Sequence, residues 1–77
     1  MDINNAISIM KENVKNQYAK CYLADISGAI EHGGTYGLKI QLSYVLENCS
    51  TWRGKEAQEV KTFVKQWIKE HNEPTSD

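Results

Sequence analysis

Cysteine and histidine are the residues of this sequence that could supply a nucleophile, a general base or a soft metal ligand. The chain has two of each, Cys21, His32, Cys49 and His71. Zinc ligands usually occur in close pairs such as Cys-x-x-Cys, and none of these four residues has a neighbour at that spacing. We therefore predict no metal ion and no cofactor, and we interpret both cysteines as small buried side chains in a reducing compartment.

A catalytic site has little support in the sequence. Cys49 and His71 would be the nucleophile and the base, but no third residue is placed to orient the histidine, and 77 residues leave little chain to enclose a substrate. His32 precedes two glycines, and His71 lies near the end of a helical apolar pattern, so both occupy common helix-ending positions. We predict that the protein is not an enzyme.

The segment CSTWRG places a tryptophan and an arginine immediately before the last predicted helix. Ser50 or Thr51 is expected to cap that helix, with Trp52 covering the junction and Arg53 at its rim. In the alternative interpretation, Trp52 and Arg53 stay exposed as an anchor for a partner, because Trp, Tyr and Arg often dominate interface energies.

A row of lysines lies along one flank of the last predicted helix. Lys61, Lys65 and Lys69 follow one another at four-residue spacing, and together with Arg53 they form a candidate nucleic-acid-binding surface. The whole chain has a formal charge of -1, so no overall field attracts it to nucleic acid. A solvated helix face is the more ordinary interpretation, and nucleic acid is the less favoured partner.

Helical spacing of apolar residues predicts the first element, with Asp2 as its N-cap. Beyond residue 21 the apolar stripe moves by about a third of a turn on a wheel of 100° per residue, which favours a break between Asn16 and Tyr22. One long helix with different neighbours at its two ends remains the alternative. The glycine-rich segment HGGTYG is expected to end the second helix.

The segment LKIQLSYVLENC fits two templates. Helical spacing aligns Leu38, Leu42 and Val45, whereas alternation aligns Leu38, Ile40, Leu42 and Tyr44. We favour the helix because the only candidate for a partner strand, around residues 20–26, is poor in β-branched residues. On a helix, Ile40 and Tyr44 lie opposite the first stripe and form a second apolar face, which packs inside a bundle or meets another molecule.

The last helix has the clearest pattern, with apolar residues in one arc, glutamates early and lysines late. The sequence as a whole predicts an all-α fold, a compact bundle of three to four helices. The expected helices cover approximately residues 3–17, 20–32, 37–49 and 53–71. The alternative is an α+β fold with a hairpin formed by residues 20–26 and 38–45. We expect one helical domain over residues 1–71 and a disordered tail over residues 72–77.

Size and composition favour a small protein-protein interaction module without catalytic activity, self-associating as a homodimer. The candidate partner-binding residues are Ile40, Tyr44, Trp52 and Arg53. The N-terminus lacks the pattern of a signal peptide, and the apolar runs are too short to cross a bilayer. We therefore expect a cytoplasmic protein with no membrane partner, and a modulator of a host protein encoded by a phage or a mobile element fits these features.

Overall fold

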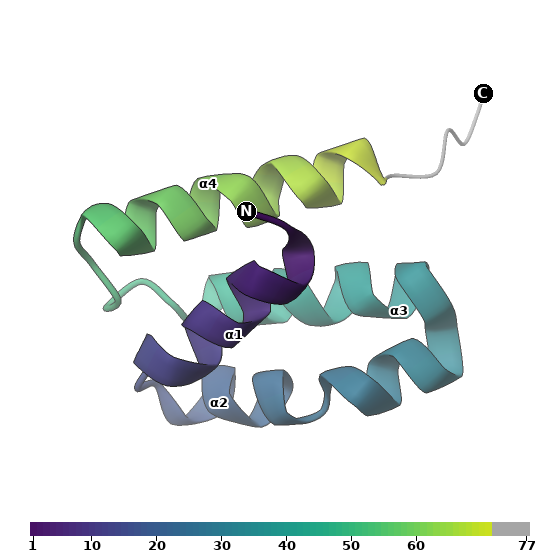
Figure 1. Ribbon diagram of the computed structural model, residues 1–77. Helices are drawn as coiled ribbons and strands as arrows, with labels where there is room; N and C mark the ends of the chain where they lie inside the picture. Colours follow the sequence, from purple (N-terminus) through teal and green to yellow (C-terminus); the bar gives the residue numbers. More distant parts are fainter. Residues whose placement is uncertain (72–77) are drawn as a thin grey trace.

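A computed structural model describes residues 1–71, and within this range the chain forms four helices and no strand (Figure 1). The helices are α1 (Ile3–Asn13), α2 (Gln17–Ala24), α3 (Ile26–Glu47) and α4 (Lys55–Glu70). The prediction of an all-α fold is confirmed, and the alternative hairpin does not form, because both of its segments are helical. The predicted tail, residues 72–77, lies outside the described residues. No helix within residues 1–71 is long and apolar enough to cross a membrane.

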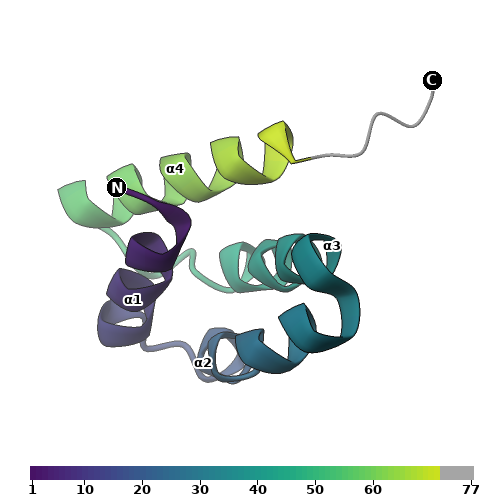
Figure 2. The same cartoon turned by 45° about the vertical axis from the view of Figure 1, so that its right-hand side comes forward.

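The four helices form a closed ring around one core. α1 packs against α2 and α4, and α3 packs against the same two helices. Figures 1 and 2 show α4 along one side of the second half of α3, α2 along the other side, and α1 crossing between α2 and α4. The buried side chains of the core cluster come from all four helices and from the turns that follow α1 and α3: Ala6, Ile7, Met10, Val14, Ala19, Leu23, Ile26, Leu38, Leu42, Val45, Cys49, Val60 and Val64.

The break between α1 and α2 lies at residues 14–16, just before the predicted interval. The Asp2 side chain accepts a hydrogen bond from the Asn5 backbone N–H at 2.7 Å, as predicted for the N-cap. At the other end Val14 is extended, and its side chain is buried in the core. Asn16 then caps α2 by accepting from the Ala19 N–H at 3.0 Å. Asn16 therefore begins a second helix, and α1 ends at Asn13 instead of residue 17 as predicted.

The glycine-rich segment separates two helical stretches, as predicted, and α3 includes both of them. α3 runs through it with a single non-helical residue, Gly34, at φ 57° and ψ -140°. The second half of α3 then returns alongside α2 (Figure 2). A Cβ atom on Gly37 would overlap the carbonyl oxygen of Ala29, so the two halves of α3 approach closely because this position has no side chain. The predicted helix 20–32 therefore covers α2 and the first half of α3, which are divided at Asp25. The predicted helix 37–49 corresponds to the second half of α3.

The last helix is confirmed, but its cap is not the predicted one. α4 begins at Lys55, and Gly54 at φ 115° is its N-cap, without a side-chain hydrogen bond. Ser50 and Thr51 are exposed in the turn before it and do not cap the helix. At its other end, His71 is the C-cap: its ring stacks on Trp67 at a centroid distance of 4.2 Å.

Three glycines around the bend predict three different outcomes on substitution by alanine. Gly33→Ala should raise the stability by about 0.5–1 kcal/mol, because the position is helical and no atom lies within 4 Å of the added Cβ. Gly34→Ala should lower it by about 1–3 kcal/mol, because residues with a side chain rarely adopt φ 57° with ψ -140°. Gly37→Ala should lower it by about 1–3 kcal/mol, because the backbone of Ala29 must move.

Urea denaturation followed by circular dichroism measures the three values. Gly33→Ala is the matched control, since it makes the same chemical change in the same segment without a steric conflict. Equal midpoints for the Gly33 and Gly37 variants would contradict the close approach of the two halves of α3.

Candidate functional site

The four tyrosines of the chain lie in α2 and α3. After the bend in α3, Tyr36, Ile40 and Tyr44 follow at four-residue spacing and therefore line one side of the helix. Their side chains are 58%, 36% and 45% exposed. The opposite side of the same helix is buried in the core through Leu38, Leu42 and Val45. The second half of α3 is thus apolar on two sides, and only one of them is covered within the chain.

The exposed row on α3 continues onto α2 through a pair of stacked rings. The Tyr22 and Tyr44 rings lie 5.2 Å apart between centroids, with 18° between their planes. Next to them, the Gln41 side chain donates a hydrogen bond to the Tyr22 carbonyl at 2.9 Å. Tyr18 lies one helical turn before Tyr22 and is 70% exposed. We call this surface the tyrosine face, formed by Tyr18, Tyr22, Tyr36, Ile40 and Tyr44.

A second row borders the tyrosine face on α3. Lys39, Ser43 and Glu47 also follow at four-residue spacing, next to the row of Tyr36, Ile40 and Tyr44. The Lys39 ammonium lies 5.1 Å from the centroid of the Tyr36 ring, within the range of a cation-π contact. The Ser43 hydroxyl donates to the Lys39 carbonyl at 3.0 Å. This second row therefore has a positive side chain, Lys39, at one end and a negative side chain, Glu47, at the other. Between them lies Ser43, whose hydroxyl already has an acceptor.

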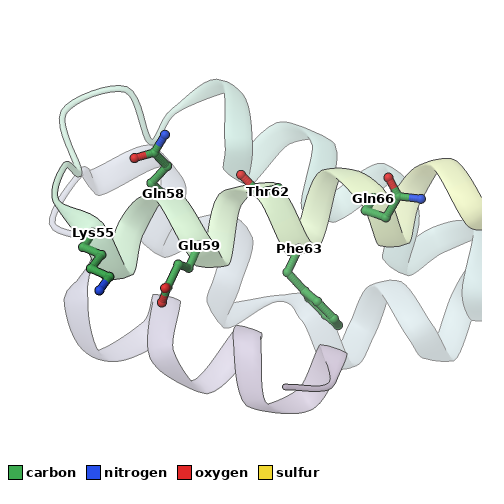
Figure 3. A pocket seen from close by; sticks show the side chains of 6 residues that line it. All are labelled: Lys55, Gln58, Glu59, Thr62, Phe63 and Gln66. Atoms are coloured by element: carbon green, nitrogen blue, oxygen red, sulfur yellow. The ribbon is translucent and has the colours of Figure 1, made fainter.

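The outer side of α4 has a different character. Its hollow is lined by six residues of this helix: Lys55, Gln58, Glu59, Thr62, Phe63 and Gln66 (Figure 3). Phe63 points toward α1 in this view and packs against the core, and the other five are polar and exposed. This surface has the composition of a solvated helix face.

The four predicted partner-binding residues fall into two places. Ile40 and Tyr44 belong to the tyrosine face, whereas Trp52 is half-buried and packs against the core from the loop before α4. Arg53 is exposed in that loop and lines a hollow with Lys15 of the α1–α2 connection. The sequence analysis did not include Tyr18, Tyr22 or Tyr36 among the candidate binding residues. Their four-residue spacing could have indicated them, since it joins Tyr18 to Tyr22, and Tyr36 to Ile40 and Tyr44.

Lys61 holds the loop between α3 and α4. Its ammonium donates to the carbonyl oxygens of Cys49 at 2.6 Å and Trp52 at 2.5 Å, and it lies 5.9 Å from the centroid of the Trp52 ring. Backbone carbonyl groups in a loop lack the regular partners of a helix, so hydrogen bonds from a charged donor stabilise them. Of the four candidate nucleic-acid-binding residues, Lys61 is thus half-buried in a structural contact, and Arg53, Lys65 and Lys69 are exposed.

The cysteines and histidines are dispersed. Both thiols are free: Cys49 is buried as expected, but Cys21 is exposed on α2, which corrects the prediction of two buried cysteines. Lys61 contacts the Cys49 carbonyl, and His71 lies ten residues further on, about 15 Å along α4. His71 is therefore not next to Cys49. Within residues 1–71, no three residues among His, Cys, Asp and Glu are grouped so that they could hold a metal ion.

Comparison with protein-family models, with curated proteins and with solved structures gives no match. The interpretation of the tyrosine face therefore rests on its own residues.

The contact made by Lys61 predicts a loss of stability on its removal. Lys61→Met keeps much of the aliphatic chain but leaves the Cys49 and Trp52 carbonyls without their charged donor, which should cost about 1–3 kcal/mol. Lys65→Met, one turn further along α4 and exposed, is the matched control and should change stability by less than about 0.5 kcal/mol. Equal urea midpoints for the two variants would show that Lys61 is a surface lysine like its neighbour.

The buried thiol predicts a pH dependence. Burial raises the pKa of Cys49 above its ordinary value of 9.0, although the nearby Lys61 ammonium opposes the rise. The unfolded chain then loses this proton at a lower pH than the folded chain. Stability should fall as pH increases from about 9 toward the higher pKa of the folded state.

The variant Cys49→Ala isolates this effect from the titration of other groups. It should lose less stability than the parent between pH 8 and 10.5, whereas Cys21→Ala, at the exposed thiol, should follow the parent. Parallel stability curves for the parent and Cys49→Ala would contradict the assignment.

Proposed function

We propose that the protein is a non-catalytic protein-binding module and that the tyrosine face is its contact surface. The observation that carries this proposal is the row of Tyr36, Ile40 and Tyr44, which is 36–58% exposed on a helix whose opposite side already forms the core. Leaving such a row in water forgoes the free energy of its burial, about 25 cal/mol per Å² of apolar area. Contiguous exposed apolar surface of this kind is typical of protein interaction sites.

The composition of the tyrosine face suits a protein partner. Tyrosine provides a large contact area at low cost in conformational entropy, and it is enriched among the residues that dominate interface energies. The stacking of Tyr22 on Tyr44 fixes the position of two of the rings before any partner arrives. The Gln41 hydrogen bond to Tyr22 also ties α3 to α2 at this point. A pre-organised surface loses less entropy on binding.

The charges also favour a protein over a polyanion. Residues 17–47, which form α2 and α3, contain only five charged side chains, Lys20, Asp25, Glu31, Lys39 and Glu47, and these are of mixed sign. A nucleic-acid surface requires basic residues that neutralise phosphates. The exposed Lys65 and Lys69 of α4 share that helix with the exposed Glu56, Glu59 and Glu70. Within residues 1–71, this mixture of charges favours a protein over nucleic acid as the partner.

The proposal includes a setting for the protein. A chain of 77 residues that works by binding alone fits a modulator of a host protein, encoded by a phage or a mobile element and acting in the cytoplasm. This part rests on size and composition, whereas the location of the contact surface rests on the exposed row of α3.

Photo-crosslinking tests whether the tyrosine face is the contact surface. Replacement of Ile40 by p-benzoylphenylalanine should give covalent adducts with protein on irradiation in bacterial cells that express the chain, because the probe lies in the contact. The same replacement at Gln66, exposed on α4, is the matched control and should give none.

Adding Tyr44→Asp to the Ile40 probe should reduce the adducts at least about 10-fold, as expected when a central interface aromatic is lost. Circular dichroism should show unchanged helical content. Adducts of equal yield at positions 40 and 66 would mean that the tyrosine face is not a specific interface.

A further inference from the structure

We propose that a hollow beside the α1–α2 and α3–α4 connections binds a small phosphate monoester, with Lys15 and Arg53 as its charged contacts. This hollow shares no residue with the tyrosine face, and its ligand does not depend on the proposed function. The basis of the proposal is a lining of basic side chains and neutral hydrogen-bond donors from two distant parts of the sequence.

Two connections form the hollow. Asn13 and Lys15 come from the end of α1 and the residues that follow it, whereas Thr51, Trp52 and Arg53 come from the loop before α4. Figure 1 shows both connections at the same end of the molecule. The hollow has a volume of about 460 Å³, which lies in the range of small-molecule sites. We call it the basic hollow.

The charge of this region differs from that of the whole chain. A second hollow adjoins the basic hollow, since Trp52 and Arg53 line both, and it adds Lys61 of α4. Five described residues line each hollow and two line both, so eight residues are involved, of which three are basic and none is acidic. The chain as a whole has nine basic and ten acidic residues. The basic hollow is therefore a local positive region on a chain of formal charge -1.

The two cations of the basic hollow are available to a ligand. Lys15 and Arg53 are exposed, and within residues 1–71 neither side chain makes an ion pair or a hydrogen bond. The planar fork of an arginine matches two oxygens of a phosphate group. A phosphate monoester carries about -1.5 to -2 charges at pH 7, so it gains more from two cations than a carboxylate or a phosphodiester with a single charge.

Neutral and partly used donors complete the lining. The Asn13 amide uses one of its two N–H groups for the Ile9 carbonyl, at 2.8 Å, and the other remains. Lys61 donates to two backbone carbonyls, and its ammonium has a third N–H group. The Thr51 hydroxyl is exposed at the same hollow. A phosphate monoester has three strong acceptor oxygens, which this set of donors suits.

Contacts within the chain hold the backbone of both walls before a ligand arrives. On one wall, the Trp52 N–H donates to the Cys49 carbonyl at 3.0 Å, and Lys61 binds the Trp52 carbonyl. These contacts fix the position from which Arg53 extends. On the other wall, Val14 is buried in the core next to Lys15. A ligand therefore orders only side chains, which lowers the entropic cost of binding.

The exposure of the two cations predicts a weak affinity. Water and dissolved salt screen charges at the surface of a protein. We expect a dissociation constant on the order of 0.1–10 mM for a simple phosphate monoester at moderate ionic strength.

An NMR titration of the full chain, labelled with ¹⁵N, tests the proposal with methyl phosphate at constant ionic strength. The backbone signals of Lys15, Thr51 and Arg53 and the indole N–H signal of Trp52 should shift along one saturation curve. Dimethyl phosphate, a diester with one charge, is the matched control ligand and should bind at least about 10-fold more weakly.

Variants locate the site. Arg53→Gln should weaken methyl phosphate at least about 10-fold, and Lys15→Gln at least about 3-fold, because each removes a charged donor. Lys65→Gln, at an exposed position of α4 outside both hollows, is the matched control and should stay within about 2-fold of the parent. Circular dichroism checks that each variant keeps the helical content of the parent.

Three results would overturn the site. The first is a titration with methyl phosphate that shows no saturable shift up to about 50 mM. The second is equal weakening by Arg53→Gln and Lys65→Gln, since the anion would then follow net charge instead of a site. The third is equal affinity for methyl phosphate and dimethyl phosphate, which would remove the preference for a monoester.

Two further measurements separate this inference from the proposed function and from a phosphorylated protein as the ligand. Tyr44→Asp should leave methyl phosphate binding within about 2-fold of the parent, whatever its effect on protein adducts, because Tyr44 lines neither hollow. A peptide with a central phosphoserine should bind no more tightly than free phosphoserine. Binding of the peptide at least about 10-fold tighter would overturn the small-molecule ligand and place the phosphate group on a protein.

Discussion

The contact of Gly37 with the Ala29 carbonyl sets the spacing on which the tyrosine face depends. A side chain at position 37 would push the two halves of α3 apart. At the observed spacing the Tyr22 and Tyr44 rings stack, and Gln41 reaches the Tyr22 carbonyl. The exposed surface is therefore a consequence of backbone packing several residues away, and its rings are held by contacts within the chain.

The closed ring of helices depends on a second polar contact, at the opposite end of α3. Lys61 donates to two carbonyl groups in the connection that leads from α3 to α4. These groups belong to the loop beyond the end of α3, and a lysine from the following helix donates to both of them. One side chain of α4 therefore fixes the path of the loop, while Trp52 covers the core beside it.

Helical periodicity was enough to predict α4, the helical state of residues 38–47 and the position of Ile40 and Tyr44 opposite the buried stripe, because these depend on residues close in sequence. The Asp2 cap was predicted for the same reason. The helix end in the glycine-rich segment was also predicted, because glycine favours chain reversal and positive φ. The Asn16 and Gly54 caps were not predicted, since several residue types fit each position until the neighbouring helices are placed. Lys61 was interpreted as a surface residue because its two acceptors are nine and twelve positions away in sequence. The pairing of Tyr22 with Tyr44 depends on the reversal of α3 and could not be read from spacing alone.

The ring order has a consequence for how the chain folds during synthesis. α2 and α3 are consecutive and pack on each other, so their contacts become available as soon as residue 47 has left the ribosome. α1 packs on α2 but also on α4, which follows α3 in the chain. One side of α1 therefore stays uncovered until α4, residues 55–70, has also been synthesised. Closing the ring joins helices that are far apart in sequence, and such contacts form more slowly than local ones.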